Sequence, residues 1–496
     1  MSLNQPIHTG GSSELEGSPR QWFAAIAVLV LLTEQTALGL SLIAPALGQL
    51  ATKYHTTQIA WMITIFMLAG AVLTPLLGKI GDRVGKKRVL VITALVGTAG
   101  SVICALASNY GTVLMGRALM GSAAAFLPLT YSLVRDVFPE KYRNLSIGIA
   151  TNGAGVVTIL GPFLAGFLID QIAPEAVFWF MAALSLAGAV GTILIVPESE
   201  TRNRSAFDVP GIISLAVGLL ALMYGITNLT AWGVLSARSL TFVGGGLVVL
   251  VAWWMWELRA AEPFIDPRLL SSRPMWTVIL GYSLICSGMV VATSYLPTML
   301  QTPRSLGGDY GFGLDATGVA VYCILGGIAT VAVGVGVGVA SRRYGFRPFL
   351  LLSGVFIIAA SLVLAFLHTE SWMPILGFGL VGVASMSYVA GAGLMMQLTP
   401  EKSRGVSAGM LAAIQGVIGS TVLQVAGLVL SNHVRATPGA GPGPLVYSTS
   451  GWVLTFGVGA VAGLIGLAIA TLVPKPQKQA EPATGAEGPL RATAGA

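Results

Sequence analysis

Two charged residues lie inside long apolar runs of this 496-residue sequence, and both are candidates for chemistry. Glu34 falls about twelve residues into the first run, roughly 18 Å along a helix and near the centre of a bilayer that the run would span. A lone carboxyl group at that depth is costly and indicates a functional site by default. Because a low dielectric disfavours the charged carboxylate, Glu34 is suited to accept a proton in one state and release it in another.

Gln35 and Thr36 follow Glu34 directly and extend the polar surface of the same helix. The alternative interpretation is a carboxyl group that a fixed partner satisfies permanently, so that it serves packing alone. Arg117 lies in the fourth apolar run, and its guanidinium keeps its charge at any accessible pH. It therefore needs backbone carbonyls or a carboxylate nearby. Glu34 is one possible partner, and backbone carbonyls alone are the other.

A short loop between the second and third apolar runs is strongly charged. Its eleven residues, Gly78 to Arg88, hold six charges, although only 9% of the chain is charged. We expect glycines such as Gly78 and Gly85 to permit a tight turn and close helix approach. We expect Asp82, next to Arg83, to accept hydrogen bonds from a helix N-terminus. The cations that follow, Lys86 and Lys87, are expected to face lipid headgroups.

The fifth apolar run is rich in residues that shape a helix. It contains Gly153, Gly155, Gly161, Pro162 and Gly166. A proline inside a helix removes a backbone hydrogen bond and kinks the helix, and glycines let it lie close to a neighbour. Plain packing is the alternative role of such residues in membrane helices.

The elements that must position these residues are membrane-spanning helices. Hydrophobic residues make up 54% of the chain, and runs of about 20 apolar residues are long enough to cross a bilayer. Fourteen such runs lie near 22–47, 58–77, 88–107, 110–134, 144–169, 176–196, 208–228, 239–257, 275–300, 316–340, 348–367, 374–396, 405–430 and 452–473. With both termini placed in the cytoplasm, 22 of the 27 Lys and Arg residues fall in cytoplasmic segments, as the positive-inside rule requires.

The composition argues against several other classes of protein. The cations are spread over short loops, so a nucleic-acid surface is not indicated. The three cysteines lie inside apolar runs, and the four histidines have no ligand spacing. We therefore expect no disulfide framework and no metal site. The first apolar run is too long for the core of a signal peptide, which predicts a retained first helix.

An internal repeat divides the chain into two halves. Residues 139–143, Pro-Glu-Lys-Tyr-Arg, recur at 400–404 as Pro-Glu-Lys-Ser-Arg, and Gly121 matches Gly382 at the same offset of 261. Two six-helix halves in the same orientation follow, as in parallel-repeat transporters. The predicted parts are a cytoplasmic N-terminal segment at 1–21, a first half at 22–196, an inserted helix pair with linkers at 197–274, a second half at 275–473, and a disordered cytoplasmic tail at 474–496.

Positions that differ between the halves are candidates for function, because features that the architecture alone requires should recur. Asp82 becomes Arg342, and Arg117 becomes Phe378. The pair Gly161-Pro162 becomes Val422-Leu423.

These motifs resemble those of the major facilitator superfamily, and the resemblance covers about residues 20–475. The charged loop is similar to the family pattern G-x-x-x-D-R-x-G-(R/K)-(R/K). Arg117 to Gly121 resembles the family's fourth-helix motif R-x-x-x-G, and the fifth run resembles the antiporter motif G-x-x-x-x-x-x-x-G-P-x-x-x-G. The chain is most similar to the fourteen-helix drug:H⁺ antiporters, although Glu34-Gln35-Thr36 replaces their usual D-x-T and Pro45 stands two residues further on.

The resemblance implies an all-α membrane protein with the fold of that superfamily, fourteen transmembrane helices and no enzymatic activity. Glu34 and Arg117 would couple transport to protons, the charged loop would gate the cytoplasmic side, and the fifth helix would seal the outer side. Transport would be driven by the proton gradient without a cofactor, by a monomer in the bacterial plasma membrane. The predicted substrate-binding residues are Glu34, Gln35, Thr36, Tyr282, Ser283, Ser287, Ser294, Tyr295 and Gln415.

With a single buried carboxyl group and much apolar lining, we expect export of lipophilic compounds that are neutral or carry one positive charge. An exporter of a lipid or a dedicated metabolite would share nearly every feature. A proton-coupled importer of a polar solute would use the same fold but should carry more paired charges or amides. A membrane enzyme or receptor would need a catalytic constellation or a soluble sensing domain, and neither is visible in the sequence.

Overall fold

The structure, a computed structural model, describes residues 19–199, 208–233, 235–260, 263, 267–307, 310–367, 369–399, 404–435 and 446–474. Most of the predicted N-terminal segment, nearly all of the predicted tail and the repeat residues 400–403 lie outside the described residues. Within the described ranges the chain is helical, apart from turns, connecting loops and one isolated antiparallel bridge between Val434 and Tyr447.

The first half contains six spans. They are α1 (Pro19–Thr33) with α2 (Gln35–Ser41), η1 (Ala44–Ala46) and α3 (Leu47–Lys53); α4 (Trp61–Val84); α5 (Lys86–Leu106); α6 (Tyr110–Met120) with η2 (Gly121–Ala125) and α7 (Phe126–Val137); α8 (Glu140–Gln171); and α9 (Ala176–Ile195). The inserted pair consists of α10 (Val209–Thr227) and α11 (Leu229–Trp232), followed by α12 (Ala237–Ser239), η3 (Leu240–Gly244) and α13 (Gly245–Glu257).

The second half repeats the arrangement after the short helix α14 (Pro267–Leu270). Its elements are α15 (Arg273–Gln301), α16 (Arg304–Gly307), α17 (Ala316–Tyr344), α18 (Arg347–Phe366), α19 (Trp372–Ala384) with α20 (Met386–Leu398), α21 (Arg404–Ser431) and α22 (Thr449–Thr471). In the described part, thirteen helical segments are long and apolar enough to span a membrane. The 32-residue α8 lies in the bundle beside α17 and takes the place of the remaining predicted span, so the fold class predicted from the sequence is confirmed.

The repeat is visible in the packing of the two halves. The fourth span of each half is broken near its middle, at η2 in the first half and at Ser385 in the second. A Cβ atom on Gly121 would lie 2.5 Å from the carbonyl oxygen of Phe66, and one on Gly382 would lie 2.1 Å from that of Gly326. Both glycines thus let this span approach a neighbouring helix of its own half, as small residues do in membrane bundles.

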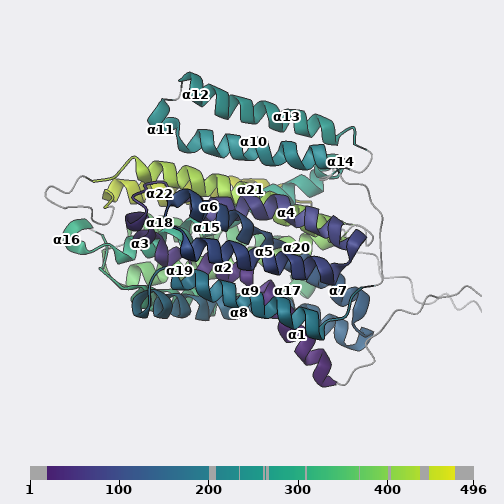
Figure 1. Ribbon diagram of the computed structural model, residues 1–496. Coiled ribbons are helices and arrows are strands. Elements are labelled where there is room, and N and C mark those ends of the chain that lie inside the picture. Colours follow the sequence, from purple (N-terminus) through teal and green to yellow (C-terminus); the bar gives the residue numbers. More distant parts are fainter. Residues whose placement is uncertain are drawn as a thin grey trace, which may run out of the picture.

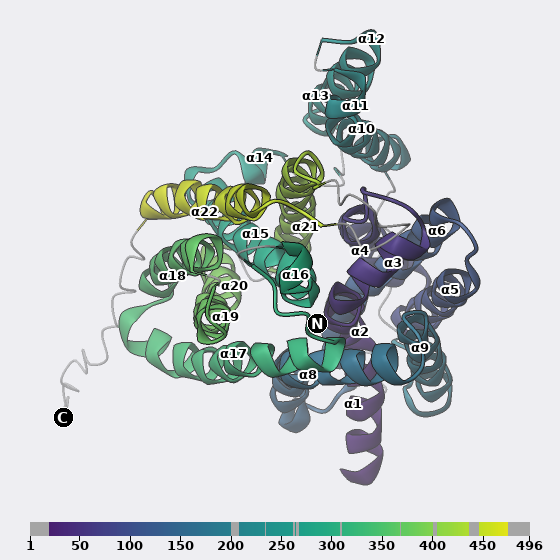
Figure 2. The same cartoon turned by 90° about the vertical axis from the view of Figure 1, so that its left-hand side faces the viewer.

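The two halves meet along two seams. The helix α4 packs against α21 at one seam, and α8 packs against α17 at the other; Figure 2 looks along the helices and shows both pairs. The inserted pair stands outside the bundle, where α10 contacts α4 and α21 and α13 packs on α10 (Figures 1 and 2). We call the end with the charged loop at Gly85 the basic end, and the opposite end, with α3 and α16, the far end.

Candidate functional site

Glu34 lies at the junction of α1 and α2, where the helix continues almost without a break. Its N–H donates to the Val30 carbonyl at 3.0 Å, and its own carbonyl accepts from the Leu38 N–H at 2.9 Å. The side chain is only 8% exposed, and its Oε2 atom is buried without a hydrogen-bond partner. Because buried polar groups are normally satisfied, such an atom calls for an explanation.

Gln35 adds a second unpaired group directly beside Glu34. Its side chain is buried, and its Nε2 atom also has no hydrogen-bond partner. Thr36, by contrast, donates to the Ala123 carbonyl of η2 at 3.0 Å. The structure therefore gives the Oε2 atom of Glu34 no fixed partner of the kind that a role in packing alone would require. The carboxyl oxygen can take up a proton or accept a hydrogen bond, and the amide nitrogen can donate a hydrogen bond to a water molecule or a substrate.

Arg117 is fully buried and joins three helices through the backbone. Its Nε donates to the Met62 carbonyl of α4 at 2.8 Å, and its Nη2 donates to the Gly39 carbonyl of α2 at 3.1 Å. The guanidinium also lies over the Phe66 ring, 4.5 Å from its centroid. Among the ion pairs of the described residues, none joins Arg117 to Glu34. Of the two partners considered from the sequence, the structure shows the backbone carbonyls.

The charged loop makes its turn at Gly85. This residue has a φ of +130° and separates α4 from α5, and that conformation favours glycine. The close helix approach occurs at Gly81, where a Cβ atom would lie 2.8 Å from the Leu129 side chain of α7. At Gly78 a Cβ atom would meet nothing within 4 Å. Gly78 thus does not provide the close approach expected from the sequence.

Lys86 corrects the expectation that the cations after the turn face lipid headgroups. Its side chain is only 4% exposed, with Nζ 2.7 Å from Asp136 and 3.3 Å from Asp82. Asp136 also accepts a hydrogen bond from Ser199. Because an ammonium group is stable out of water only beside compensating charge, these two carboxylates explain why Lys86 turns inward.

The carboxylate that caps a helix N-terminus here belongs to Glu198. Its two oxygens accept from the N–H groups of Lys87 and Arg88, at 2.9 and 3.1 Å, in the first turn of α5. The sequence predicts the capping role for Asp82, which instead pairs with Lys86. No motif identifies Glu198 and Asp136 as functional residues, and the only signal for them is that both follow an apolar run on the predicted cytoplasmic side. Arg83 lies one residue before the end of α4 and is exposed.

The glycine motif of α8 makes two close contacts toward the far end. A Cβ atom on Gly161 would lie 2.5 Å from the Ser41 hydroxyl of α2, and one on Gly166 would lie 2.6 Å from the Thr317 Cα of α17. The second contact crosses from one half to the other. Pro162 lies inside α8, as do Gly153 and Gly155.

The predicted substrate residues of α15 make their hydrogen bonds within their own half. Tyr282, Ser283, Ser287, Ser294 and Tyr295 are all buried. Ser287 donates to the Ser283 carbonyl of its own helix at 2.6 Å, and the Tyr295 hydroxyl lies 3.4 Å from the Leu423 carbonyl of α21. Gln415 is half-buried on α21. Their role in substrate binding stays a prediction.

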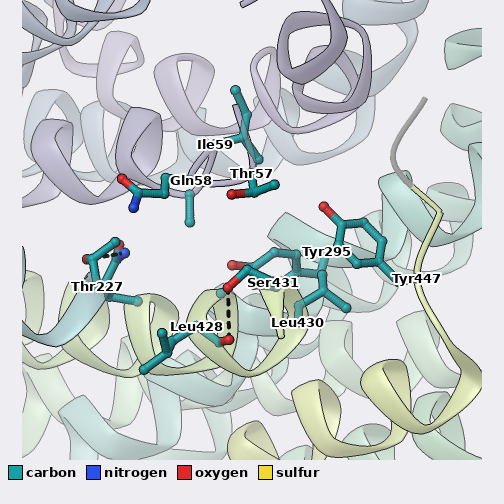
Figure 3. A pocket seen from close by; sticks show the side chains of 12 residues that line it. Thr57, Gln58, Ile59, Thr227, Tyr295, Leu428, Leu430, Ser431 and Tyr447 are labelled. Carbon is teal, nitrogen blue, oxygen red and sulfur yellow. Dashed lines mark hydrogen bonds between the residues drawn. The ribbon is translucent and has the colours of Figure 1, made fainter. Parts of the chain in front are cut away.

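A buried polar chain connects the inserted pair to both halves near the far end. Thr64 of α4 donates to Gln424 of α21 at 2.9 Å, and the Gln424 amide donates to Thr227 of α10 at 2.6 Å. A cavity of about 20 Å³ lies beside this chain, and Figure 3 shows Thr227, Tyr295 and Ser431 among its lining residues. Such a volume holds about one water molecule. Within the described residues, no group of three or more His, Cys, Asp or Glu side chains could hold a metal ion.

Comparisons with other proteins identify the relatives of the chain. A sequence profile of the Major Facilitator Superfamily matches residues 29–423. The chain is 28% identical to the tetracenomycin C resistance and export protein of Streptomyces glaucescens, over 86% of this chain and 78% of that protein. It is 26% identical to the multidrug efflux pump LfrA of Mycolicibacterium smegmatis, over 80% and 79% of the two chains.

Two further similarities widen the range of relatives. The chain is 26% identical to the uridine/deoxyuridine transporter of Lactococcus lactis, over 81% of this chain and 85% of that protein. The crystal structure of peptide transporter POT in complex with sulfate superposes with a TM-score of 0.65 and 14% identity, over 93% and 96% of the two chains. At that identity the likeness shows the fold alone.

Proposed function

Because the chain belongs to the Major Facilitator Superfamily, and is thus a multi-pass membrane transporter and not an enzyme, we propose that it exports lipophilic compounds in exchange for protons. The substrates are neutral or carry one positive charge. The buried and unpaired carboxyl oxygen of Glu34 is the observation that carries this proposal. The names of the Streptomyces and Mycolicibacterium relatives, an export protein and an efflux pump, support the direction of transport.

In the proposed cycle the two halves rock about a central site, which is open to one side of the membrane at a time. Glu34 takes up a proton from outside, releases it inside, and changes its charge between the two states. A carboxylate without a fixed partner is free to do this, because no ion pair must be broken first. The unpaired Gln35 amide beside it offers a hydrogen-bond donor to a substrate.

Other predicted residues take supporting parts in the cycle. Arg117 fixes the position of α2 against α4 and α6, and its partner on α2, Gly39, lies shortly after Glu34 in the chain. The glycines of α8 allow the far end to close, which makes the far end the outer side in this proposal. The basic end then faces the cytoplasm of a bacterial cell, with both termini on that side. The proton gradient drives the cycle without a cofactor, and a monomer is sufficient.

Import of a polar solute is the second candidate. It is favoured by the unpaired polar atoms of Gln35 and Ser283, which would suit a solute rich in hydrogen-bonding groups. The name of the Lactococcus relative, a uridine/deoxyuridine transporter, points the same way. An exporter of a lipid or a dedicated metabolite is the remaining alternative. Only a transport assay with such a compound distinguishes it from the drug exporter and from the importer.

Purified protein in liposomes tests the proposal. An internal pH dye reports proton movement across an imposed pH gradient while ethidium, tetraphenylphosphonium or tetracenomycin C is added. We expect each effective compound to trigger proton movement with the wild type and not with Glu34→Gln. Glu175→Gln is the matched control, because this acid lies at the far end in an ion pair with Lys53.

Three outcomes would count against the proposal. Proton movement that persists in Glu34→Gln would move the carrier role to another group. Proton-driven accumulation of uridine, with no response to the lipophilic compounds, would favour the importer. If none of these compounds triggers proton movement, the proposed substrate class would be excluded and a lipid or a dedicated metabolite would be favoured.

A further inference from the structure

Asp170 lies one residue before the end of α8, and no motif in the sequence singles it out. Its Oδ2 accepts hydrogen bonds from the Thr317 backbone N–H at 2.8 Å and from the Thr317 hydroxyl at 2.7 Å. Its Oδ1 accepts from the Ala316 N–H at 3.2 Å. One carboxylate thus receives three hydrogen bonds from two successive residues.

These bonds cross between the two halves of the molecule. Asp170 belongs to α8 of the first half, whereas Ala316 and Thr317 form the first turn of α17 in the second half. One turn before Asp170, the close contact of Gly166 with Thr317 brings the two helices together at the same place. The first N–H groups of a helix have no partner within the helix, and the helix dipole favours a negative charge there.

The N-terminus of α17 does not depend on Asp170 for its own capping. Asp315, the residue just before α17, accepts from the Gly318 N–H at 2.6 Å. The helix therefore keeps a cap from its own half when Asp170 withdraws. The energetic effect of Asp170 falls on the contact between the halves and not on the formation of the helix.

We propose that Asp170 is the latch of the far end, the residue that holds α17 to α8 while that end is closed. This inference rests on the alternating-access cycle proposed above and assigns a part in it to a residue outside the proton and substrate site. The far end cannot open along the α8–α17 seam unless all three bonds of Asp170 break. Among the described residues, two other hydrogen bonds join the halves toward this end, from the Gln301 amide to the Pro45 carbonyl at 2.8 Å and from Thr64 to Gln424 at 2.9 Å, and both are between neutral groups.

Hydrogen bonds to a carboxylate are stronger than hydrogen bonds between neutral groups. Replacing Asp170 by Asn keeps its size but removes the charge, so we expect the open-to-closed ratio of the far end to rise about tenfold, which corresponds to about 1.4 kcal/mol. Asp170→Glu keeps the charge and should remain closer to the wild type. Asp315→Asn is the matched control, because it removes one negative charge from the same end of α17 but from within the same half.

Spin labels on the far end measure this ratio directly. Ser108, between α5 and α6, and Ser371, between α18 and α19, are exposed and belong to opposite halves. Each is changed to Cys and labelled, and the native cysteines are all buried. Electron–electron double resonance then gives the distribution of distances between the labels. Neither a substrate nor a proton gradient is needed, so the result is independent of the role of Glu34.

We expect Asp170→Asn to increase the ratio of long to short distances about tenfold relative to the wild type, while Asp315→Asn leaves it unchanged. An unchanged distribution in Asp170→Asn would overturn the proposal, as would an equal shift in Asp315→Asn, which would indicate a capping effect. Gly166→Ala provides a second route if Asp170→Asn does not fold. The added methyl group would push against Thr317 and should open the α8–α17 seam. If the distances between the labels in Gly166→Ala stay as short as in the wild type, the latch would also be contradicted.

Discussion

Glu34 and Arg117 are both charged residues buried in the first half, but their surroundings differ. Arg117 has two carbonyl partners and an aromatic ring, whereas one oxygen of Glu34 has no partner. The sequence located both residues because each interrupts an apolar run. The sequence does not identify their partners. The carbonyls of Gly39 and Met62 are backbone groups, and every residue type has such a group. The proposed cycle therefore uses Glu34 as the mobile charge and Arg117 as a fixed one.

Arg117→Lys tests the fixed role. A lysine keeps the charge but has no planar fork that can serve the Met62 and Gly39 carbonyls together. A buried carbonyl left unpaired costs about 1–3 kcal/mol, so we expect a lower apparent melting temperature in detergent. Proton movement in proteoliposomes should persist in the protein that remains folded. Unchanged stability with a complete loss of proton movement would instead place the guanidinium in the proton path.

The helices themselves were predictable from the sequence, because spans of about 20 apolar residues leave few alternatives. The contacts between elements were not. Lys86 is buried because Asp136 lies 50 positions further along the chain and folds back against it, and Glu198 caps α5 across a separation of more than 100 positions. The sequence of the basic loop alone shows only its cations and predicts that they lie at the lipid surface. The structure shows a network that ties the ends of α4, α5, α7 and α9 together.

Lys86→Met should destabilise the basic end. It leaves Asp136 and Asp82 without their cation, and the loss of one partner from a buried pair costs about 3 kcal/mol. Lys87→Met is the control from the next position, because the Lys87 ammonium makes an exposed bond to the Ile193 carbonyl. Thermal unfolding in detergent should show a clear decrease for Lys86→Met and little change for Lys87→Met. Equal effects would argue against the buried network.

At the far end, the ion pair between Lys53 and Glu175 predicts a dependence on pH. Burial is the largest single influence and raises the pKa of Glu175, but the hydrogen bond from Lys53, a backbone hydrogen bond and the charge of Lys53 together lower it more, so the pKa lies below its usual value of 4.5. The pair therefore stabilises the fold fully above pH 4.5, and this contribution is lost as the pH falls through the pKa of the folded state. In Glu175→Gln the melting temperature should decline less on acidification than in the wild type. Parallel declines in the two proteins would contradict this sign.

In the whole molecule, the inserted pair lies over only one of the two seams between the halves. Thr64, Gln424 and Thr227 join α4, α21 and α10 in a single buried chain, and Figure 2 shows α10 standing over the α4–α21 seam. The α8–α17 seam has no such cover in that view. The sequence established that two helices are inserted, because an even number preserves the orientation of the second half. Where the pair docks depends on polar contacts between distant helices, which no repeat or run of charge reveals.

Gln424→Leu tests whether this chain holds the inserted pair. The change leaves the buried hydroxyls of Thr64 and Thr227 without their amide partner, and we expect a loss of about 1–3 kcal/mol of stability. Gln415→Leu on the same helix is the control, because Gln415 is only half-buried. Thermal unfolding in detergent compares the two variants. A larger decrease for Gln415→Leu would show that the junction contributes little.

Proton release on substrate binding is the sharpest test of the proposal that Glu34 exchanges a proton for substrate. Ethidium binding to the purified protein is measured by calorimetry in buffers of different ionisation enthalpy at neutral pH. We expect the wild type to release protons as ethidium binds, so that the observed heat varies with the buffer. In Glu34→Gln the heat should be the same in every buffer. Equal proton release by both proteins would contradict the claim, because the proton would then come from another group.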